Sequence, residues 1–190
     1  MFIQTEQTPN PATLKFLPGE PVMDGGTADF PTAETASSRS PLAERLFSVK
    51  GVAGVFLGDD FITVTKAEDK EWQVLKPSIL GAIMEHYTLG GPAVLADEGA
   101  ATDEGAATKG GGEEDDVVQQ IKELIETRVR PAVAQDGGDI IFRSFEAGVV
   151  YLQLQGSCSG CPSSTATLKS GIENMLKHYV PEVEEVRAVT

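Results

Sequence analysis

The two cysteines of the chain, Cys158 and Cys161, lie three positions apart in the segment GSCSGCPSS. A disulfide between cysteines this close closes too small a loop to stabilise a fold, and secreted disulfide frameworks use more cysteines at wider spacing. Two thiols at this spacing are typical of a metal site or of a dithiol redox site. Cys158 and Cys161 are therefore the residues of this sequence most suited to chemistry.

The cysteine segment lies between an alternating strand pattern, Val150 to Gln155, and a helical pattern that begins at Pro162. Proline is favoured at the first position of a helix, so we expect both thiols at a helix N-terminus. Unsatisfied N–H groups and the positive end of the helix dipole favour the thiolate there, and the thiolate is the form that binds metals. Gly156 and Gly160 allow the backbone to wrap closely around a bulky anionic group.

Two cysteines supply only half of the four ligands that structural zinc sites and iron–sulfur clusters generally use. The histidines do not complete the set. His86 belongs to the other half of the chain, where we expect a helix-end cation, and His178 lies about 25 Å along the helix from Cys161 at 1.5 Å per residue. A twofold dimer closes the site with four thiolates, two from each copy. A cluster held at such an interface is easier to lose than one in a core, which suits delivery to other proteins.

A thiol-disulfide oxidoreductase that uses the same two cysteines is the alternative from another functional class. Thioredoxin also places C-x-x-C where a strand passes into a helix. Here, however, Ser159-Gly160 replaces the usual Gly-Pro between the cysteines, no Trp precedes them, and Pro162 follows the second. We favour metal ligation over redox exchange, and place a half-site for zinc third.

The formal net charge of the chain is −14, and half of it lies between Leu89 and Asp116, where eight acids accompany a single cation, Lys109. No stripe of Lys and Arg with interleaved aromatics is present, so we expect no nucleic-acid partner. No stretch approaches the roughly 20 apolar residues that cross a bilayer, and the N-terminus lacks the pattern of a signal peptide. We expect the cytoplasm of a bacterium and no membrane partner, with the mitochondrial matrix as the alternative location.

A segment rich in Gly, Ala and acids separates the two halves of the chain, and it contains DEGAAT twice, at 97–102 and 103–108. With so little apolar surface to bury, this segment cannot offset the entropy lost on ordering. The sequence therefore predicts an α+β protein of two small domains, residues 1–88 and 113–190, joined by a disordered, flexible linker of residues 89–112.

Apolar periodicity and turn residues predict the elements of each half. The first half is expected to hold strands at Phe2–Gln4 and Thr13–Phe16, a helix after Ser40, a hairpin of 52–57 with 61–65, and a helix that starts anew at Pro77. The second half is expected to hold a helix from Val117 to near Pro131, a turn at 136–139, strands at 140–145 and 150–155, a helix after the cysteines, and a strand at 183–189. The order α-β-β-α-β predicts a small sheet with helices on one face.

Gly137 and Gly138 have two interpretations. A turn that needs a positive φ explains them, and this is the interpretation we prefer. Contact with the cysteine loop is the alternative. The N-terminal half holds no cysteine, so it cannot donate a thiolate. We expect it to recognise client proteins or an upstream scaffold, the alternative being that it only stabilises the chain.

The segments QDGGDI (135–140) and GSCSGCPSSTATLKSGIE (156–173) closely resemble the C-terminal domain of NifU-type scaffolds. MFIQTEQTPNPATLKFLPG at the start, GVAGVFLGDDFITVTK and W-x-x-LKPSILGAIMEHY resemble the N-terminal domain of the Nfu branch. The resemblance implies a non-catalytic carrier, in which Cys158 and Cys161 of two subunits share a [4Fe–4S] cluster as a homodimer. It further implies that the cluster is assembled there or received from an upstream scaffold, and is transferred to apo iron–sulfur enzymes.

Overall fold

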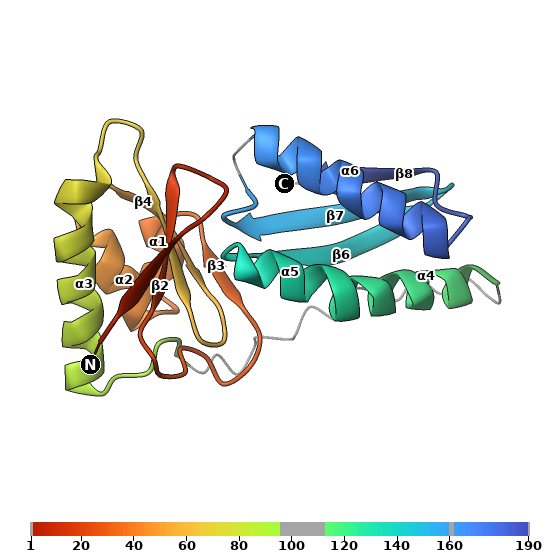
Figure 1. The fold of residues 1–190 in the computed structure, drawn as a ribbon. Helices are drawn as coiled ribbons and strands as arrows, with labels where there is room; N and C mark the ends of the chain where they lie inside the picture. The colour runs from red at the N-terminus through yellow and green to blue at the C-terminus, as the bar shows by residue number, and fades with distance from the viewer. Residues whose placement is uncertain (1, 96–112, 160–161, 190) are drawn as a thin grey trace.

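The computed structural model of the chain describes residues 2–95, 113–159 and 162–189. They form two α+β domains, each with its own sheet and its own apolar core (Figure 1). We call the described residues before 96 the N-terminal domain and those after 112 the C-terminal domain. The predicted fold class, two small α+β domains, is confirmed. Most of the predicted linker, including both DEGAAT repeats, lies outside the described residues.

The N-terminal domain is a five-stranded antiparallel sheet in the order β1-β2-β5-β4-β3, with helices on one face (Figure 1). The strand over Thr13–Phe16, the hairpin and the helix after Ser40 are confirmed, whereas β3 and α1 were not predicted. The first strand lies at Gln4–Gln7, later than expected. The elements are β1 (Gln4–Gln7), β2 (Thr13–Leu17), β3 (Ala28–Phe30), α1 (Ala33–Ser37), α2 (Pro41–Phe47), β4 (Val52–Leu57), β5 (Ile62–Lys66) and α3 (Trp72–Leu89).

Ser40 shows why α2 begins where it does. Its side-chain oxygen accepts a hydrogen bond from Ala43 N at 3.0 Å, and Pro41 follows in the first turn, where its missing N–H is not needed. The same hydroxyl donates to Ala93 O, and Leu95 N donates to Arg39 O at 2.7 Å. Residues 90–95 are thereby held against the N-terminal domain.

Helix α3 corrects the prediction that a new helix starts at Pro77, because it runs unbroken through that residue. A proline inside a helix costs about 3 kcal/mol through its missing N–H and its clash with the preceding turn. Buried residues on both sides of Pro77, Leu75 before it and Ile79 and Ile83 after it, pack into the same core. This packing outweighs the local preference and keeps the two parts on one axis.

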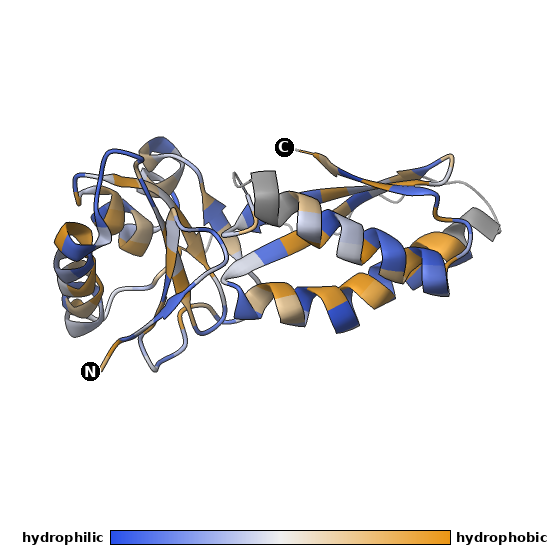
Figure 2. Cartoon of the chain, turned by 45° about the horizontal axis from the view of Figure 1, so that its top comes forward, coloured by the Kyte–Doolittle hydropathy of each residue, from blue (hydrophilic) through white to orange (hydrophobic). Residues whose placement is uncertain are grey.

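The C-terminal domain is a three-stranded sheet in the order β6-β7-β8, with its helices on one face (Figure 1). β6 and β7 are antiparallel, whereas β8 runs parallel to β7 after the helix crossover, as the α-β-β-α-β order predicts. Hydrophobic residues recur along the helices (Figure 2). The elements are α4 (Glu113–Leu124), η1 (Ile125–Val129), α5 (Arg130–Gln135), β6 (Gly138–Glu146), β7 (Val149–Gly156), α6 (Pro162–Tyr179) and β8 (Glu185–Val189).

The first helix of this domain does not end near Pro131, as the sequence predicted, but continues to Gln135. A π-helical turn, η1, precedes the proline, and Arg130 N donates to Ile125 O across five residues. Such a turn inserts an extra residue and relaxes the spacing of the hydrogen bonds just before Pro131. Ile125 and Val129 before the proline and Val133 after it are buried in one core, which holds the helix together.

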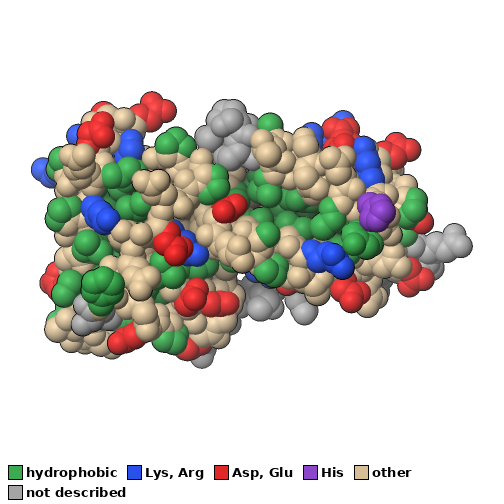
Figure 3. Space-filling model, viewed as in Figure 1, with side chains coloured by type: hydrophobic (Ala, Val, Ile, Leu, Met, Phe, Trp, Pro, Cys, Tyr) green, Lys and Arg blue, Asp and Glu red, His purple; other side chains and the backbone are tan. Residues whose placement is uncertain are grey.

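Apolar side chains remain visible on the surface of the C-terminal domain between α6 and the α4–α5 helix (Figure 3). Leu124 of α4 and Leu168 and Met175 of α6 are partly buried and pack against the core of this domain. Among the described helices, none has the length and apolar character that crossing a membrane requires.

Arg130 and Asp139 form the main buried ion pair of the C-terminal domain. Arg130 Nε and Nη2 each donate to a different oxygen of Asp139 at 2.8 Å, which is the two-pronged geometry that favours such pairs. The Asp139 side chain is 4% exposed, and it also accepts from Ile140 N at 2.7 Å. Hydrogen bonding to Asp139 raises the pKa of Arg130, so the guanidinium stays charged. The pair joins the start of α5 to β6.

We predict that Arg130→Met lowers the free energy of unfolding by about 3 kcal/mol at neutral pH, because it leaves the buried Asp139 carboxylate without its cation. Urea unfolding of the full chain measures the loss. Lys177→Met is the matched control, since it removes a cation from the exposed pair of Lys177 with Glu173 and should change the midpoint far less. Equal losses in the two variants would contradict the prediction.

Candidate metal centre

Cys158 lies in the loop between β7 and α6, at the strand-to-helix junction that the sequence predicts. Its side chain is 7% exposed and belongs to the apolar core of the C-terminal domain. Helix α6 begins at Pro162, which confirms the predicted helix start. Cys161 lies outside the described residues, so the structure places one member of the candidate pair.

The turn before β6, at Asp136 and Gly137, lies against this loop. Gly138 pairs with Gly156 in the β6-β7 register, and a Cβ on Gly138 would come within 2.7 Å of Cys158 Sγ and 2.8 Å of Gln155 O. A Cβ on Gly156, whose φ is +63°, would lie 2.8 Å from Gly137 O. Only glycine fits at these close approaches.

Both interpretations of the glycine pair are correct. Gly137 has a φ of +77°, as the turn interpretation requires, while Gly138 touches the cysteine loop. Two hydrogen bonds fix the contact: Ser157 N donates to Gly137 O at 3.2 Å, and Ser157 Oγ donates to Asp136 O at 2.5 Å. The segment QDGGDI therefore supports the loop from the neighbouring strand.

The expectation that Cys158 is held as a thiolate is wrong in this arrangement. Burial raises the pKa of the Cys158 thiol to about 11, and the carboxylates of Asp136 and Asp139 raise it further, while a hydrogen bond with Ser157 lowers it. The sulfur lies among apolar groups and near two negative charges, and this outweighs the helix N-terminus. A cation must therefore displace the proton of Cys158 in order to bind it.

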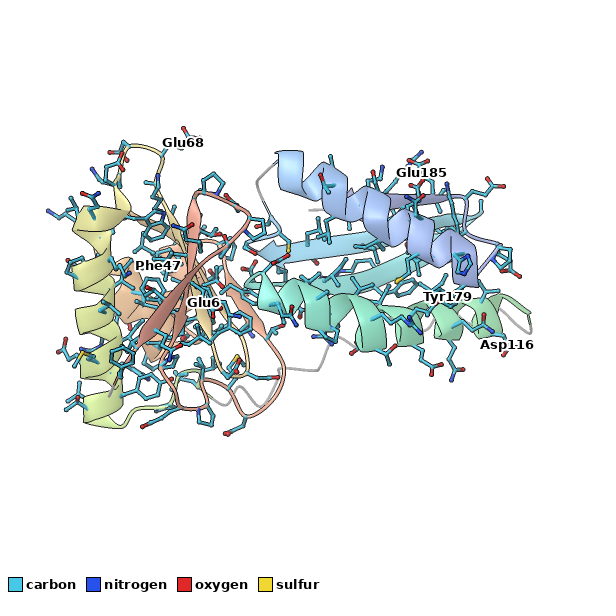
Figure 4. All side chains as sticks on the ribbon, viewed as in Figure 1. Glu6, Phe47, Glu68, Asp116, Tyr179 and Glu185 are labelled. Carbon is cyan, nitrogen blue, oxygen red and sulfur yellow. The ribbon has the colours of Figure 1, made fainter. Side chains whose placement is uncertain are left out.

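Neither histidine lies near Cys158. His86 is buried in the last turn of α3, and burial, followed by the charge of Arg45, lowers its pKa, so the expectation of a helix-end cation is wrong. His178 is exposed in the last turn of α6, beside Tyr179 at the end of the C-terminal domain away from the N-terminal domain (Figure 4). Within residues 2–95, 113–159 and 162–189, no three His, Cys, Asp or Glu side chains gather as metal ligands.

Asn10, from the N-terminal domain, contacts the cysteine loop on both sides of Cys158. Its Nδ2 donates to Ser157 O at 3.2 Å and to Ser159 O at 3.3 Å. Its Oδ1 accepts from Ala12 N at 3.0 Å, which fixes the side chain within its own turn. The asparagine is 4% exposed. It thereby joins two backbone segments about 150 residues apart in the chain.

A cross-strand row on the open face of the N-terminal sheet faces the same loop. The register pairs Lys15 with Thr63, Thr63 with Phe56, and Phe56 with Asp29. Neighbours of these residues along each strand point the other way, into the core beneath the helices, because side chains alternate along a strand. We call Lys15, Thr63, Phe56 and Asp29 the docking row.

Each member of the docking row meets the C-terminal domain. Lys15 Nζ donates to Ala134 O and Gln135 O at 3.2 and 3.3 Å. Thr63 Oγ1 donates to Gly137 O at 2.7 Å. Gly156 offers its backbone N–H to Asp29, and the Phe56 ring lies 3.0 Å from the position that a Cβ on Gly156 would take. Beside the row, Thr27 Oγ1 donates to Asp139 Oδ2 at 2.7 Å.

Sequence reasoning missed Asn10 and the docking row. Alternation over Thr13–Leu17 and Ile62–Lys66 does indicate that Lys15 and Thr63 share a face opposite the core. A polar face of an antiparallel sheet is ordinarily solvated, so nothing local distinguishes it from a covered one. The signal that could have been followed is Asn10, which lies between Pro9 and Pro11 in a pattern typical of a turn.

Comparison with known proteins gives two family matches. Residues 3–90 match the model described as "Scaffold protein Nfu/NifU N terminal", and residues 121–187 match the "NifU-like domain". The chain is 54% identical to the human protein named "NFU1 iron-sulfur cluster scaffold homolog, mitochondrial", over 100% of this chain and 72% of that protein. It is 53% identical to "NifU-like protein 4, mitochondrial" of Arabidopsis thaliana, over 98% of this chain and 65% of that protein.

Among solved structures, the solution structure of a NifU-like protein from Saccharomyces cerevisiae aligns with a TM-score of 0.46 at 26% identity. The alignment covers 51% of this chain and 87% of that one. In the sequence alignments, this chain spans 65% of the length of the Arabidopsis relative and 72% of the length of the human one.

Asp29 gives a pH-dependent prediction. Burial raises the pKa of this carboxyl to about 6, against 3.8 ordinarily, and the bond from Gly156 only partly offsets the effect. The folded state therefore holds the proton more tightly than the unfolded state between about pH 4 and 6. Stability from this group is present below about pH 4 and is lost as pH rises to about 6, by at most about 3 kcal/mol.

We predict that Asp29→Asn removes this loss. The unfolding free energy of the variant should therefore rise relative to that of the parent as the pH increases from about 4 to 6. Urea unfolding at several pH values measures it. Asp60→Asn, at the exposed hairpin tip, controls for removal of one carboxylate. A constant difference between parent and Asp29→Asn across this range would refute the prediction.

Proposed function

Since this chain belongs to the Nfu/NifU family of iron–sulfur cluster scaffold proteins, we propose that it carries a [4Fe–4S] cluster between two copies of itself and delivers it to other proteins. The observation that carries the proposal is the position of Cys158 in a glycine-lined loop between β7 and α6, within the segment that matches the NifU-like domain. The name of the human relative supports the scaffold role.

We assign Cys158 and Cys161 as the ligands that each copy contributes. Four thiolates from two chains meet the usual requirement of a [4Fe–4S] cluster, which one C-x-x-C cannot. The cluster is cargo, so its site need only hold it until an acceptor is present. Gly138 and Gly156 let the two backbone segments beside the loop approach closely, because neither position has room for a Cβ.

Proton release is part of cluster loading in this proposal. Because the pKa of Cys158 is raised, the thiol gives up its proton only when iron supplies compensating positive charge. The same raised pKa argues against the thiol-disulfide oxidoreductase alternative, in which Cys158 would have to be a ready thiolate at neutral pH. We propose a non-catalytic role, which the scaffold name of the human relative supports.

The partners in this role are apo iron–sulfur enzymes that receive the cluster and an upstream scaffold that supplies it. The relatives are named as mitochondrial proteins, which favours the mitochondrial matrix, the alternative location, for this chain. The bacterial cytoplasm stays a prediction from the sequence.

Anaerobic reconstitution with ferrous iron and sulfide tests the ligands. For the parent, we expect absorbance at about 400 nm and about four iron atoms per dimer. Cys158→Ser and Cys161→Ser should each lose both, because each substitution removes two of the four thiolates of the dimer. Ser170→Ala, an exposed change on α6, serves as the control and should load like the parent. A parent that stays colourless, or cysteine variants that load fully, would overturn the assignment.

Dilution tests whether the cluster belongs to the dimer. Because neither chain supplies four ligands, we expect cluster absorbance to elute only at twice the chain mass in anaerobic size exclusion, and to fall on dilution although both cysteines are intact. An apo-acceptor added in excess should gain the lost iron. Absorbance that elutes with the monomer, or a dimer that keeps its cluster beside the acceptor, would contradict the proposal.

A further inference from the structure

The contact between the two domains buries polar groups on the open face of the N-terminal sheet. Eight polar or charged residues are buried among those that the structure describes, and five of them take part in hydrogen bonds across the domain boundary. The five are Asn10, Lys15, Thr63, Asp139 and Ser157. Polar side chains on a solvated sheet face bond to water, whereas buried ones need partners in the protein. The hydrogen bonds of these five residues therefore indicate that this face of the sheet is covered by the C-terminal domain.

Most hydrogen bonds across the boundary run from side chains of the N-terminal domain to the C-terminal domain. Asn10, Lys15 and Thr63 of the N-terminal domain donate five hydrogen bonds, and every acceptor is a main-chain carbonyl of the C-terminal domain. The acceptors lie in residues 134–137 and 157–159. These two segments are the turn and the loop that enclose Cys158, so the N-terminal domain recognises the backbone of the cysteine loop and its support.

Lys15 adds charge complementarity. Its ammonium binds Ala134 O and Gln135 O, the last carbonyls of α5, where the helix dipole is negative. The Phe61 ring lies 4.6 Å from the same ammonium and Glu6 Oε2 lies 3.7 Å from it, so the side chain is held in place on its own domain. The donor face is thus prepared for the end of this helix.

The contact is also of a kind that can open. It consists largely of hydrogen bonds to backbone carbonyls, which water can replace at each position. Polar contacts between the domains of one chain resemble transient interfaces more than permanent ones. The two domains have separate apolar cores, so each domain keeps its own core when the contact opens, and Phe56 of the docking row loses its cover.

We propose that Asn10 and the docking row form a docking surface for the cysteine loop of the same chain, and that this docking competes with the pairing of two cysteine loops around a cluster. The N-terminal domain lies at the end of β7 where α6 begins (Figure 1). Two chains that share a cluster must bring their loops together at that end. Docking itself is independent of the proposed function, whereas the competition rests on it.

The docking half is tested without any cluster. Asn10→Asp keeps the oxygen that binds Ala12 N but removes the Nδ2 donor of both bonds to the loop, and Lys15→Met removes the cation while it keeps most of the side-chain length. We expect this double variant, as the full apo chain, to show a larger radius of gyration by small-angle X-ray scattering than the parent. An unchanged radius in a variant with parental far-UV circular dichroism overturns the docking.

The competition half uses the same variants during reconstitution. We expect the double variant to form the cluster-bridged dimer at least threefold faster than the parent at equal chain concentration. Gln73→Glu with Lys50→Met makes the same two chemical changes at exposed positions and should match the parent in both measurements. An opened variant that loads no faster overturns the competition.

The outcomes separate the two proposals. If neither the parent nor the variants load a cluster, the proposed function fails, while the scattering comparison still decides whether the domains dock. Thr63→Val, which removes the donor to Gly137 O with little change of shape, gives an independent second variant. It should shift both measurements in the same direction as the double variant, and a shift in the opposite direction counts against the proposal.

Discussion

The close approach of the turn before β6 to the loop after β7 is the constraint on which the rest of the molecule depends. Gly138 and Gly156 face each other in the register, and neither position has room for a Cβ. This approach sets Cys158 against Gly138 on one side, and on the other it exposes the carbonyls of Gly137 and Ser157. The candidate site and the contact surface of the N-terminal domain are therefore two sides of one piece of backbone.

This geometry places opposing demands on Cys158. Its sulfur packs in an apolar core close to Asp136 and Asp139, which favours the neutral thiol, whereas a ligand must be a thiolate. Arg130 pairs with the Asp139 carboxylate through two hydrogen bonds of 2.8 Å each. In the proposed role, Cys158 becomes a ligand when a bound cation supplies positive charge and displaces its proton.

Local signals in the sequence predicted the elements that local chemistry determines. Ser40-Pro41 starts α2, Gly58 to Asp60 closes a hairpin, and Gly137 takes a positive φ. The helix start predicted at Pro77 and the helix end predicted near Pro131 were both wrong, because buried residues on both sides of each proline keep the helix continuous. The docking row could not be found, since the alternation that places Lys15 opposite the core does not reveal what covers it. Because two cysteines supply only half of four metal ligands, the sequence predicts a second copy of the chain at the site. How two copies meet does not follow from one sequence.

The cysteine loop takes part in two interactions of different strength: hydrogen bonds to the N-terminal domain and, in the proposed function, metal–thiolate bonds to a cluster. The five hydrogen bonds that Asn10, Lys15 and Thr63 donate across the domain boundary contribute about 0.5–1.5 kcal/mol each between neutral groups and about 1.5–3 kcal/mol each from Lys15, because water replaces them when they open. Attachment to one chain favours them, since it raises the local concentration of the N-terminal domain to about the millimolar range. Metal–thiolate bonding is far stronger, roughly 10–16 kcal/mol for structural zinc sites. In the proposed cycle, docking therefore prevails over chance pairing of empty loops, and a cluster bound to four thiolates prevails over docking.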